Sequence, residues 1–333
     1  MQKNYGIKFI GIGTALPSKV VKNTDLEKLY DTTDEWIYQR TGIRERRVVE
    51  EGKESGFSLS TQAAKKALSM SGVSPADLDL IIVATATPDN LYPSMSCLLQ
   101  GALGANSAIA YDLSAACSGF VYAVITAAQF IYCGTYKNIL VVGLDIHSRF
   151  MDWSDRSVSI LFGDGAGAVV LQSTLAASDE ILGYSMQSQA DSKSDLVLTN
   201  HNIFYPARNV KISPNFTKMN GKAIFEFGLK IIPETINKTL APTSLKISDF
   251  DYLIPHQANK RIIDSAAKKL GFPNEKVISN IEKVGNTSAA SIPLALKDAM
   301  DTKKIKVPCK MLWVGFGAGL TWGTVAVNWN LKL

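Results

Sequence analysis

One cysteine stands where a strand is expected to give way to a helix, among small residues that leave room around its sulfur. Cys117 lies in Y-D-L-S-A-A-C-S-G-F-V-Y-A-V-I, residues 111–125, just after an apolar strand expected over 109–113. A helix N-terminus carries unpaired N–H groups and the positive end of the helix dipole, so a thiolate there is stabilised. The sequence therefore predicts that Cys117 is a nucleophile at neutral pH, with a buried structural cysteine as the alternative.

A histidine and an asparagine occupy similar positions later in the chain. His256, in I-P-H-Q-A-N, follows a strand expected over 252–254, and Asn286, in G-N-T-S-A-A-S, precedes a helix. A neutral imidazole and a carboxamide can both donate to a carbonyl oxygen as it becomes an enolate. With a cysteine, they suit thioester chemistry. Two alternatives stay open: Asn286 as a helix cap, and a Cys-His-Asn protease, although repeated α/β halves do not resemble a papain-like layout.

The elements that must position these residues follow an α/β pattern. Strand and helix signals alternate, beginning with a strand over 7–12. Ser58 or Ser60 is expected to cap a helix that Gly72 ends, and a strand buried on both faces follows over 79–85. The polar segment 188–218 predicts a surface loop, with a lid over the site as the alternative.

The same pattern returns in the second half of the chain. The letters D-L-D-L-I-I from residue 77 match D-F-D-Y-L-I from residue 249, and V-G at 142 matches V-G at 314, both at an offset of 172 (249 − 77 and 314 − 142). We expect duplicated halves, with an extra segment in the first half over 144–161. Cys117 corresponds to Asn286 at an offset of 169 (286 − 117), so a pseudo-twofold axis would bring both helix starts to one site.

Composition narrows the class of protein. A chain of 333 residues with 46% hydrophobic and 20% charged residues can fold into two units, and no long polar tract predicts disorder. The net charge of +5 is spread without a basic tail, which argues against nucleic-acid binding. The four cysteines form no C-x-x-C pair, and no apolar run reaches the ~18 residues of a membrane span. Because the first strand is predicted almost at once, we expect no leader peptide. We expect a cytoplasmic protein without membrane insertion.

Two further site classes find little support in the sequence. The run G-I-G-T-A-L at Gly11 lacks the third glycine of a dinucleotide fingerprint. The histidines, His147, His201 and His256, are far apart, and no Cys/His pair has ligand spacing, so we expect no metal.

Several motifs together resemble one enzyme family. D-L-S-A-A-C-S-G-F, I-P-H-Q-A-N-K-R-I, G-N-T-S-A-A-S-I-P and F-G-A-G-L-T-W-G are similar, in this order, to β-ketoacyl-acyl carrier protein synthase III, as are D-E-W-I-Y-Q-R-T-G-I-R-E-R-R and I-L-F-G-D-G-A-G-A. The resemblance implies a thiolase-like fold: duplicated βαβαβαββ halves in a five-layered αβαβα arrangement, working as a homodimer. Residues 1–175 would carry the cysteine, and 176–333 the histidine and asparagine.

The resemblance also implies an activity. The family condenses a short-chain acyl-coenzyme A, here expected to be acetyl-coenzyme A, with malonyl-acyl carrier protein by a decarboxylative Claisen reaction that initiates fatty acid synthesis. Coenzyme A thioester is a substrate, and no cofactor is expected. Two alternatives remain: a related acyl-condensing or acyl-transfer enzyme of specialised metabolism, and a catalytically silent scaffold with the same fold.

Catalytic roles carry over onto matching positions. Cys117 would accept the acyl group, while His256 and Asn286 would bind the malonyl thioester oxygen and stabilise the enolate. The backbone N–H groups of Cys117 and Ala318 would form the oxyanion hole. Relatives usually have glycine where this chain has Ala318, and a backbone donor survives that change.

Binding roles carry over in the same way. The ring of Trp36 would stack on the adenine of coenzyme A against Arg156, and Arg40 would meet phosphate. Lys222 departs from an asparagine that contacts the pantetheine arm in some relatives. Tyr92, often phenylalanine in the family, would close the acyl pocket of the neighbouring subunit.

A basic helix face gives a separate indication of a partner. A helix is expected from near Ala258, with Arg261, Lys268 and Lys269 on one face, about two turns apart. Such a face suits an acidic carrier protein, and the alternative is an ordinary solvated helix surface. The residues expected to face inward are Ile262, Ile263, Ala266 and Leu270.

Overall fold

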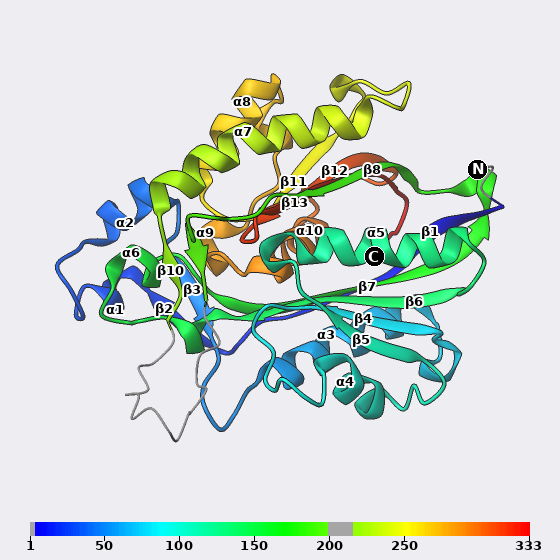
Figure 1. Cartoon of the computed structure of the whole chain (residues 1–333), viewed down its shortest axis with the longest axis horizontal. Coiled ribbons are helices and arrows are strands. Elements are labelled where there is room, and N and C mark those ends of the chain that lie inside the picture. Colours follow the sequence, from blue (N-terminus) through cyan, green and yellow to red (C-terminus); the bar gives the residue numbers. More distant parts are fainter. Residues whose placement is uncertain (1–3, 199–215) are drawn as a thin grey trace.

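The protein folds into five stacked layers of helix and sheet (Figure 1). The computed structural model describes residues 4–198 and 216–333. Two sheets lie one above the other, with α5 (Gly119–Tyr132) and α10 (Ser291–Asp301) between them. The outer layers are α3 (Gly56–Ser71) and α4 (Met95–Leu103) on one side, and α7 (Gly221–Leu240) and α8 (Lys260–Leu270) on the other.

The first sheet has the order β1-β7-β6-β4-β5. Strand β4 runs parallel to β5 and β6, while β7 is antiparallel to β1 and β6. Every residue of β4 is buried, because helices cover both faces of the sheet. The strands are β1 (Tyr5–Ala15), β4 (Leu80–Ala84), β5 (Ile109–Leu113), β6 (Asn138–Ile146) and β7 (Asp164–Leu175).

The second sheet repeats this order. Its strands follow one another as β8-β13-β12-β11, and their directions match those of β1-β7-β6-β4: two antiparallel pairings and then a parallel one. The strands are β8 (Ile181–Ser188), β11 (Tyr252–Pro255), β12 (Cys309–Gly317) and β13 (Thr321–Trp329). The duplication expected from the letter matches is therefore present in the strand order.

Glycines on equivalent strands let each sheet approach the 3-10 turn that leads into the central helix of the other half. A Cβ on Gly143 of β6 would lie 2.3 Å from the carbonyl oxygen of Ala289. A Cβ on Gly315 of β12 would lie 2.9 Å from the Cα of Ser118. Both contacts are shorter than a real side chain allows, so glycine is needed at these two positions. The matched V-G pairs of the sequence thus have one packing role.

The turns that start the two central helices are also equivalent. Ala116 and Ser288 both have positive φ, 45° and 50°, and lie 172 residues apart (288 − 116). The structural counterparts are therefore Ala116 and Ser288. The expected correspondence of Cys117 with Asn286, at an offset of 169, is wrong by three residues.

Two local expectations also need correction. Helix α3 begins at Gly56 with Ser55 as its cap, whose hydroxyl accepts from the N–H of Ser58, so neither Ser58 nor Ser60 is the cap. Gly72 ends this helix as predicted, with φ 69°. The segment 188–218 is not wholly irregular, because β9 (Leu196–Val197) pairs with β10 (Lys218–Met219). The part of it over 199–215 lies outside the described residues.

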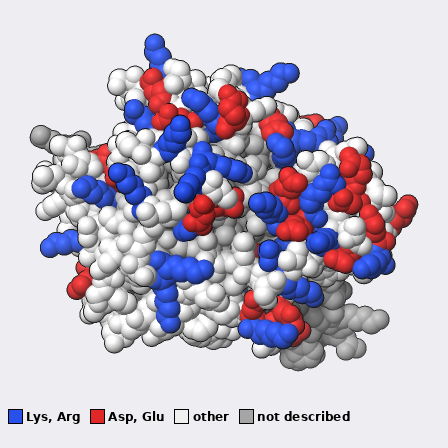
Figure 2. Space-filling model, turned by 180° about the vertical axis from the view of Figure 1, so that it is seen from behind, with Lys and Arg blue, Asp and Glu red and all other residues white. Residues whose placement is uncertain are grey.

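The remaining elements gather at one end of the layers, on the left of Figure 1. Within the described ranges, no helix is long and apolar enough to span a membrane. Figure 2 shows basic and acidic side chains interspersed over the face turned away in Figure 1. These further elements are β2 (Lys19–Lys22), α1 (Asn23–Leu26), α2 (Asp34–Thr41), β3 (Glu45–Val48), α6 (Arg156–Ser159) and α9 (Ile281–Val284).

Candidate active site

Cys117 lies in a single 3-10 turn, 116–118, between the end of β5 and the start of α5. Its side chain is only 6% exposed. Strand β12 passes directly beside it, since a Cβ on Gly317 would lie 2.8 Å from the Cβ of Cys117. The nucleophile predicted in the first half of the chain is thus packed against a strand of the second half.

The protonation of this thiol differs from the prediction. Burial raises the pKa of Cys117 to about 12, and the charge of Asp145 adds to the rise. The hydroxyl of Ser288 opposes both, because its Oγ donates to Sγ at 3.3 Å. The helix position is as expected, but removal of water outweighs it, so the resting cysteine is a thiol at neutral pH. The helix start therefore does not by itself produce a resting thiolate, and the role of Cys117 as nucleophile stays a prediction.

His256 follows β11 and is held in place through both its backbone and its side chain. Its backbone N–H donates to the carbonyl of Val314 at 2.7 Å, and its Nδ1 lies 2.8 Å from Ser291 Oγ. The ring meets Phe316 edge to face, with 5.3 Å between centroids. Burial lowers the pKa of His256 to about 3, so the imidazole is neutral at physiological pH. In the tautomer in which Nδ1 accepts from this hydroxyl, the ring proton lies on Nε2, and Nε2 is then a donor.

Asn286 is held from the first half of the chain. Its N–H donates to the carbonyl of Leu161 at 2.9 Å, and its carbonyl accepts from the N–H of Gly163 at 3.0 Å. Its Oδ1 accepts from the N–H of Ser288 at 2.9 Å, which leaves the Nδ2 group as the side chain's donor. Asn286 does not cap α10, whose cap position is Ala290. Asn286 Oδ1 nevertheless accepts from the first residue of the 3-10 turn Ser288–Ala290, which leads directly into α10, so the helix-cap alternative stays open.

Two cavities meet at Cys117. One, of about 250 Å³, contains Cys117, His256 and Asn286 and extends to Trp36 and Arg40. The other, of about 370 Å³, shares Cys117 with the first and runs in another direction, along Ala318. A larger groove of about 930 Å³ beside β2 includes none of the three predicted catalytic residues, so we place the site at the two smaller cavities. We call the first the channel and the second the acyl cavity.

The residues predicted to bind coenzyme A lie together at the outer end of the channel. The guanidinium of Arg156 lies over the Trp36 ring, 4.7 Å from its centroid, and that of Arg40 lies at 5.0 Å. Arg156 also donates to the carbonyl of Asp31. The ring and two cations are thus together, but Arg156 itself lies against the ring, so adenine would have to displace its guanidinium to stack there. Lys222 is exposed and lies 4.0 Å from Glu226.

The loop after β12 is tied to the cysteine turn. Thr321 Oγ1 lies 2.9 Å from the carbonyl oxygens of Ala115 and Ala318, and 2.7 Å from Ser118 Oγ. Ala318 lines the acyl cavity, as predicted for a residue near the sulfur. One threonine therefore fixes the relative positions of the two peptide segments whose N–H groups are the expected oxyanion donors.

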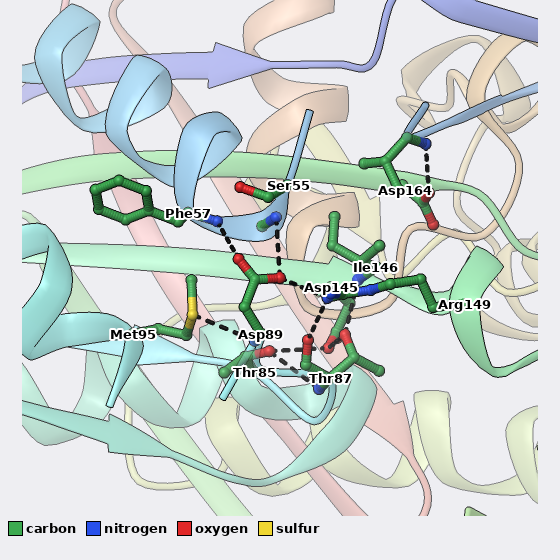
Figure 3. Close-up of polar contacts among 12 residues, drawn as sticks. Ser55, Phe57, Thr85, Thr87, Asp89, Met95, Asp145, Ile146, Arg149 and Asp164 are labelled. Carbon is green, nitrogen blue, oxygen red and sulfur yellow. Dashed lines mark hydrogen bonds and ion pairs between the residues drawn. The ribbon is translucent and has the colours of Figure 1, made fainter. Parts of the chain in front are cut away.

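Tyr92 lies apart from the cavities of its own chain. Its side chain is 86% exposed, and that of Leu91 is 71% exposed. The loop begins at a fixed point, because Asp89 accepts from the N–H of Phe57 at 2.7 Å and from Arg149 Nη2 at 2.6 Å (Figure 3). The structure therefore holds the loop base and leaves Tyr92 pointing away from the described residues.

Helix α8 carries the predicted basic face. Arg261, Lys268 and Lys269 are exposed, and Asn259 caps the helix, so it begins two residues later than Ala258. Asn259 also donates to the carbonyl of Arg40 at 3.0 Å, which joins this helix to the channel mouth. Of the residues expected to face inward, Ile262, Ile263 and Ala266 are buried and Leu270 is partly buried.

Sequence reasoning missed two residues that support the site. Ser288 donates a hydrogen bond to the Cys117 sulfur. The only sign of this role in the sequence was a hydroxyl residue in the motif G-N-T-S, close to Asn286. Asp145 is fully buried and accepts from the N–H of Ala86 at 2.8 Å and of Ala289 at 3.1 Å. It also accepts from the hydroxyls of Thr85 and Thr87 (Figure 3). No local pattern predicts such a junction, because its partners come from distant segments.

Two sheets of the same strand order that close over a buried thiol, with an imidazole and a carboxamide nearby, define a condensing enzyme of the thiolase class. A family model described as 3-oxoacyl-[acyl-carrier-protein (ACP)] synthase III matches residues 111–190, and the model of its C terminal part matches 240–329. The chain belongs to this family, and the fold and family predicted from the motifs are confirmed.

Individual relatives agree over nearly the whole length. A β-ketoacyl-[acyl-carrier-protein] synthase III from Nostoc sp. is 45% identical, covering 98% of this chain and 99% of the relative. The crystal structure of a 3-oxoacyl-[acyl-carrier-protein] synthase III from Aquifex aeolicus is 44% identical, with a TM-score of 0.90, covering 97% of this chain and all of the other. A priming β-ketosynthase of the R1128 polyketide pathway is 32% identical, with a TM-score of 0.91, covering 100% and 99%.

Proposed function

We propose that the protein condenses a short-chain acyl-coenzyme A, with acetyl-coenzyme A as the expected primer, with malonyl-acyl carrier protein to begin fatty acid synthesis. The observation that carries this proposal is the junction of two cavities at one thiol. The channel brings Cys117 together with His256 and Asn286, and the acyl cavity gives the transferred group its own space. An acyl group can thus be stored on the sulfur while a second thioester enters the channel.

In the first half-reaction, Cys117 attacks the acyl-coenzyme A carbonyl. The bond from Sγ to the acyl carbon forms, the bond from that carbon to the coenzyme A sulfur breaks, and the thiol proton passes to the departing coenzyme A thiolate. Since burial keeps Cys117 protonated at rest, the proton leaves during attack, and Ser288 stabilises the developing charge. The N–H groups of Cys117 and Ala318 would hold the oxyanion.

In the second half-reaction, malonyl-acyl carrier protein loses carbon dioxide. The electrons left behind form an enolate, whose carbon attacks the acyl carbonyl; the bond to Sγ breaks, and the thiolate takes up a proton. Neutral His256 and the Nδ2 group of Asn286 are suited to donate to the enolate oxygen. Because both are fixed before the substrate arrives, little reorganisation accompanies the appearance of charge.

The outer parts of the site suit the two carriers. Trp36, Arg156 and Arg40 would hold the adenine and phosphates of coenzyme A, and the exposed cations of α8 would meet the acidic carrier protein. The reaction uses coenzyme A thioester as a substrate and calls for no resident cofactor. Among the described residues, no group of three or more His, Cys, Asp or Glu side chains is arranged to hold a metal.

We also propose a cytoplasmic homodimer that does not act on nucleic acid, built from halves 1–175 and 176–333. Strand β5 lies at a free sheet edge, and Ile109 at its start is 54% exposed. Leu91 and Tyr92 add exposed apolar surface. An unpaired edge with apolar neighbours is an expected surface for a second copy.

A second candidate is priming in specialised metabolism, favoured by the likeness to the R1128 priming enzyme. The two candidates share Cys117 chemistry and differ in primer, so a panel of acyl-coenzyme A primers with malonyl-acyl carrier protein distinguishes them. A silent scaffold would form no acyl-enzyme, and intact-mass measurement after mixing with acetyl-coenzyme A tests that alternative.

A paired measurement tests the division of labour. Acetyl incorporation is followed by intact mass, and carbon dioxide release from malonyl-acyl carrier protein is followed separately. We expect Cys117→Ser to lose acetylation, and Asn286→Ala to become acetylated yet release carbon dioxide about 10²–10³-fold more slowly. His256→Ala should resemble Asn286→Ala. The exposed Asn274→Ala is the matched control. Release at the unmodified rate by Asn286→Ala would contradict its role.

A further inference from the structure

His147 is a buried side chain that neither half-reaction uses. It directly follows β6, is 8% exposed, and stacks on Phe162 with 4.5 Å between ring centroids. Both of its ring nitrogens, Nδ1 and Nε2, are buried without a hydrogen-bond partner in the structure described here. An imidazole always has at least one donor, and burying it unpaired is unfavourable, so this ring, which no described residue pairs, can bind a polar group of a ligand.

The ring lines the acyl cavity together with Cys117 and a second unpaired group. Thr217 lines the same cavity and is 5% exposed, and its Oγ1 is also buried without a partner among the described residues. The cavity is otherwise lined mainly by apolar or small side chains, including Phe162, Leu196 and Val197. In a mainly apolar cavity that opens on the nucleophile, two unpaired polar groups can determine which ligands bind.

The backbone holds both groups in place. On one side of His147, the N–H of Ile146 donates to Thr87 Oγ1 at 2.7 Å, a contact drawn in Figure 3. On the other side, the N–H of Ser148 donates to Asp164 Oδ1 at 2.9 Å. Thr217 is tied to the same turn, because its N–H donates to the carbonyl of Phe150 at 2.8 Å. The polar groups therefore do not have to be ordered by the substrate.

The chemistry of these groups selects one kind of partner. A neutral imidazole offers one donor and one acceptor, and a threonine hydroxyl offers both as well. An alcohol oxygen on the acyl chain is itself a donor and an acceptor, so it can satisfy both residues. A plain alkyl chain leaves them unpaired, and a carboxylate would bring a charge into a cavity whose described lining contains no lysine or arginine.

We propose that the acyl cavity prefers a primer whose acyl chain carries a hydroxyl group, and that His147 and Thr217 bind this hydroxyl. The proposal rests on the proposed function, since it assigns the acyl group on Cys117 to this cavity. His147 and Thr217 are then specificity-determining residues of the first half-reaction. The transfer to Cys117 and the release of coenzyme A proceed as before.

The test compares three primers of similar length: butyryl-, 3-hydroxybutyryl- and succinyl-coenzyme A. The rate of acyl-enzyme formation is measured by intact mass, and kcat/KM is measured with malonyl-acyl carrier protein. We expect 3-hydroxybutyryl-coenzyme A to exceed butyryl-coenzyme A by about tenfold or more in kcat/KM, because only the former pairs the buried groups. His147→Leu should reverse this order, and Thr217→Val, which keeps the shape, should reduce it.

The exposed Thr302→Val is the matched control and should leave the ratio unchanged. Thr217→Val keeps the test valid if His147→Leu does not fold. Equal use of butyryl- and 3-hydroxybutyryl-coenzyme A by the unmodified enzyme would overturn the proposal, as would a preference for succinyl-coenzyme A. Equal loss of acylation by all primers in His147→Leu would instead assign proton transfer to the ring. If acetyl-coenzyme A acylates Cys117 without any hydroxyacyl preference, only this inference fails; if no acyl thioester reacts, the proposed function fails.

Discussion

Opposing effects determine the pKa of the Cys117 thiol. The N–H groups at the start of α5 and the hydroxyl of Ser288 favour the thiolate, while burial and the charge of Asp145 favour the thiol. Burial prevails and raises the pKa to about 12. Of the favourable contributions, the Ser288 hydrogen bond is the one that a single substitution removes without altering the fold of the turn.

Ser288→Ala should make the thiol harder to ionise. A hydrogen bond to a charged group is worth ~1.5–3 kcal/mol, so its loss should raise the pKa of Cys117 by about one unit or more. The alkylation of Cys117 by iodoacetamide, followed on its own peptide by mass spectrometry, should slow about tenfold at pH 8.5. Reading the Cys117 peptide avoids the exposed Cys97 and Cys133. Ser107→Ala, at an exposed position, is the control, and an unshifted pH profile would contradict the role of Ser288.

His256 should make the protein less stable in acid. Its pKa is about 3 in the folded protein against 6.5 for the free side chain, so below pH 6.5 the unfolded chain binds a proton that the folded chain does not. The stabilisation from neutral burial is complete above pH 6.5 and is lost as the pH falls from 6.5 toward 3. Between pH 7 and pH 5 this loss amounts to about 2 kcal/mol.

Urea unfolding at equal protomer concentration tests this expectation. His256→Gln removes the titrating group, so its free energy of unfolding should fall less between pH 7 and pH 5 than that of the unmodified protein. Buried Asp164 and Glu180, whose pKa values are raised by burial, are present in both proteins and cancel in the comparison. Parallel pH profiles would show that His256 is not held neutral by the fold.

At the scale of elements, the sequence predicted the strand ends better than the contacts between them. The sequence predicted Cys117, His256 and Asn286 because each follows a strand or precedes a helix, and the structure brings the three to one cavity. The V-G pairs of β6 and β12 also gave the correct offset. What failed was the pairing of Cys117 with Asn286, because the true counterparts, Ala116 and Ser288, are defined by positive φ rather than by chemistry.

The acyl cavity shows why other parts of the candidate site could not be predicted from the sequence. His147 appeared in the sequence only as an isolated histidine, and Thr217 as one residue of a polar loop. Their meeting depends on the N–H of Thr217 reaching the carbonyl of Phe150 across more than sixty residues (217 − 150 = 67). Such a contact is set by the packing of layers, for which a local pattern carries no signal.

Helix α8 leads to a prediction about the carrier protein. Arg261→Glu with Lys268→Glu should raise KM for malonyl-acyl carrier protein by about tenfold, while acylation by acetyl-coenzyme A stays unchanged, since these charges steer a partner and do not touch the sulfur. Added salt should reduce the difference between the variant and the unmodified enzyme. Steady-state kinetics at two salt concentrations measures both effects.

Two further variants sharpen this test. Arg261 lies over the ring of Phe225, which lines the channel, so the pair Lys268→Glu and Lys269→Glu separates docking from channel packing. Lys238→Glu reverses an exposed charge on α7 and serves as the control. Equal damage to both half-reactions by the Lys268 and Lys269 pair would show that α8 is not a docking face.

At the scale of the whole molecule, the question is whether the exposed Tyr92 contributes to the acyl cavity of its own chain or to that of a second copy. Among the described strands, β5 ends the first sheet without a neighbour on its outer side, and Ile109, Leu91 and Tyr92 are all more than half exposed. Tyr92 lines neither the channel nor the acyl cavity of its own chain. An aromatic side chain held out from a fixed loop is costly in water, and a second copy paired through β5 would cover it.

If Tyr92 closes the acyl cavity of the partner, its effect on primer length should act between chains. Tyr92→Ala removes bulk from the cavity floor, so the homodimer of this variant should accept longer acyl-coenzyme A primers. In a mixed dimer with a Cys117→Ser chain, the only Cys117 thiol belongs to the Tyr92→Ala chain, whose cavity is closed by the partner's intact Tyr92. Mixed dimers, purified through two different tags and shown to be dimers by sedimentation, should therefore recover the unmodified chain-length profile. A mixed dimer that keeps the widened profile would place Tyr92 in its own chain's site, and an unwidened Tyr92→Ala homodimer would remove Tyr92 from the acyl cavity altogether.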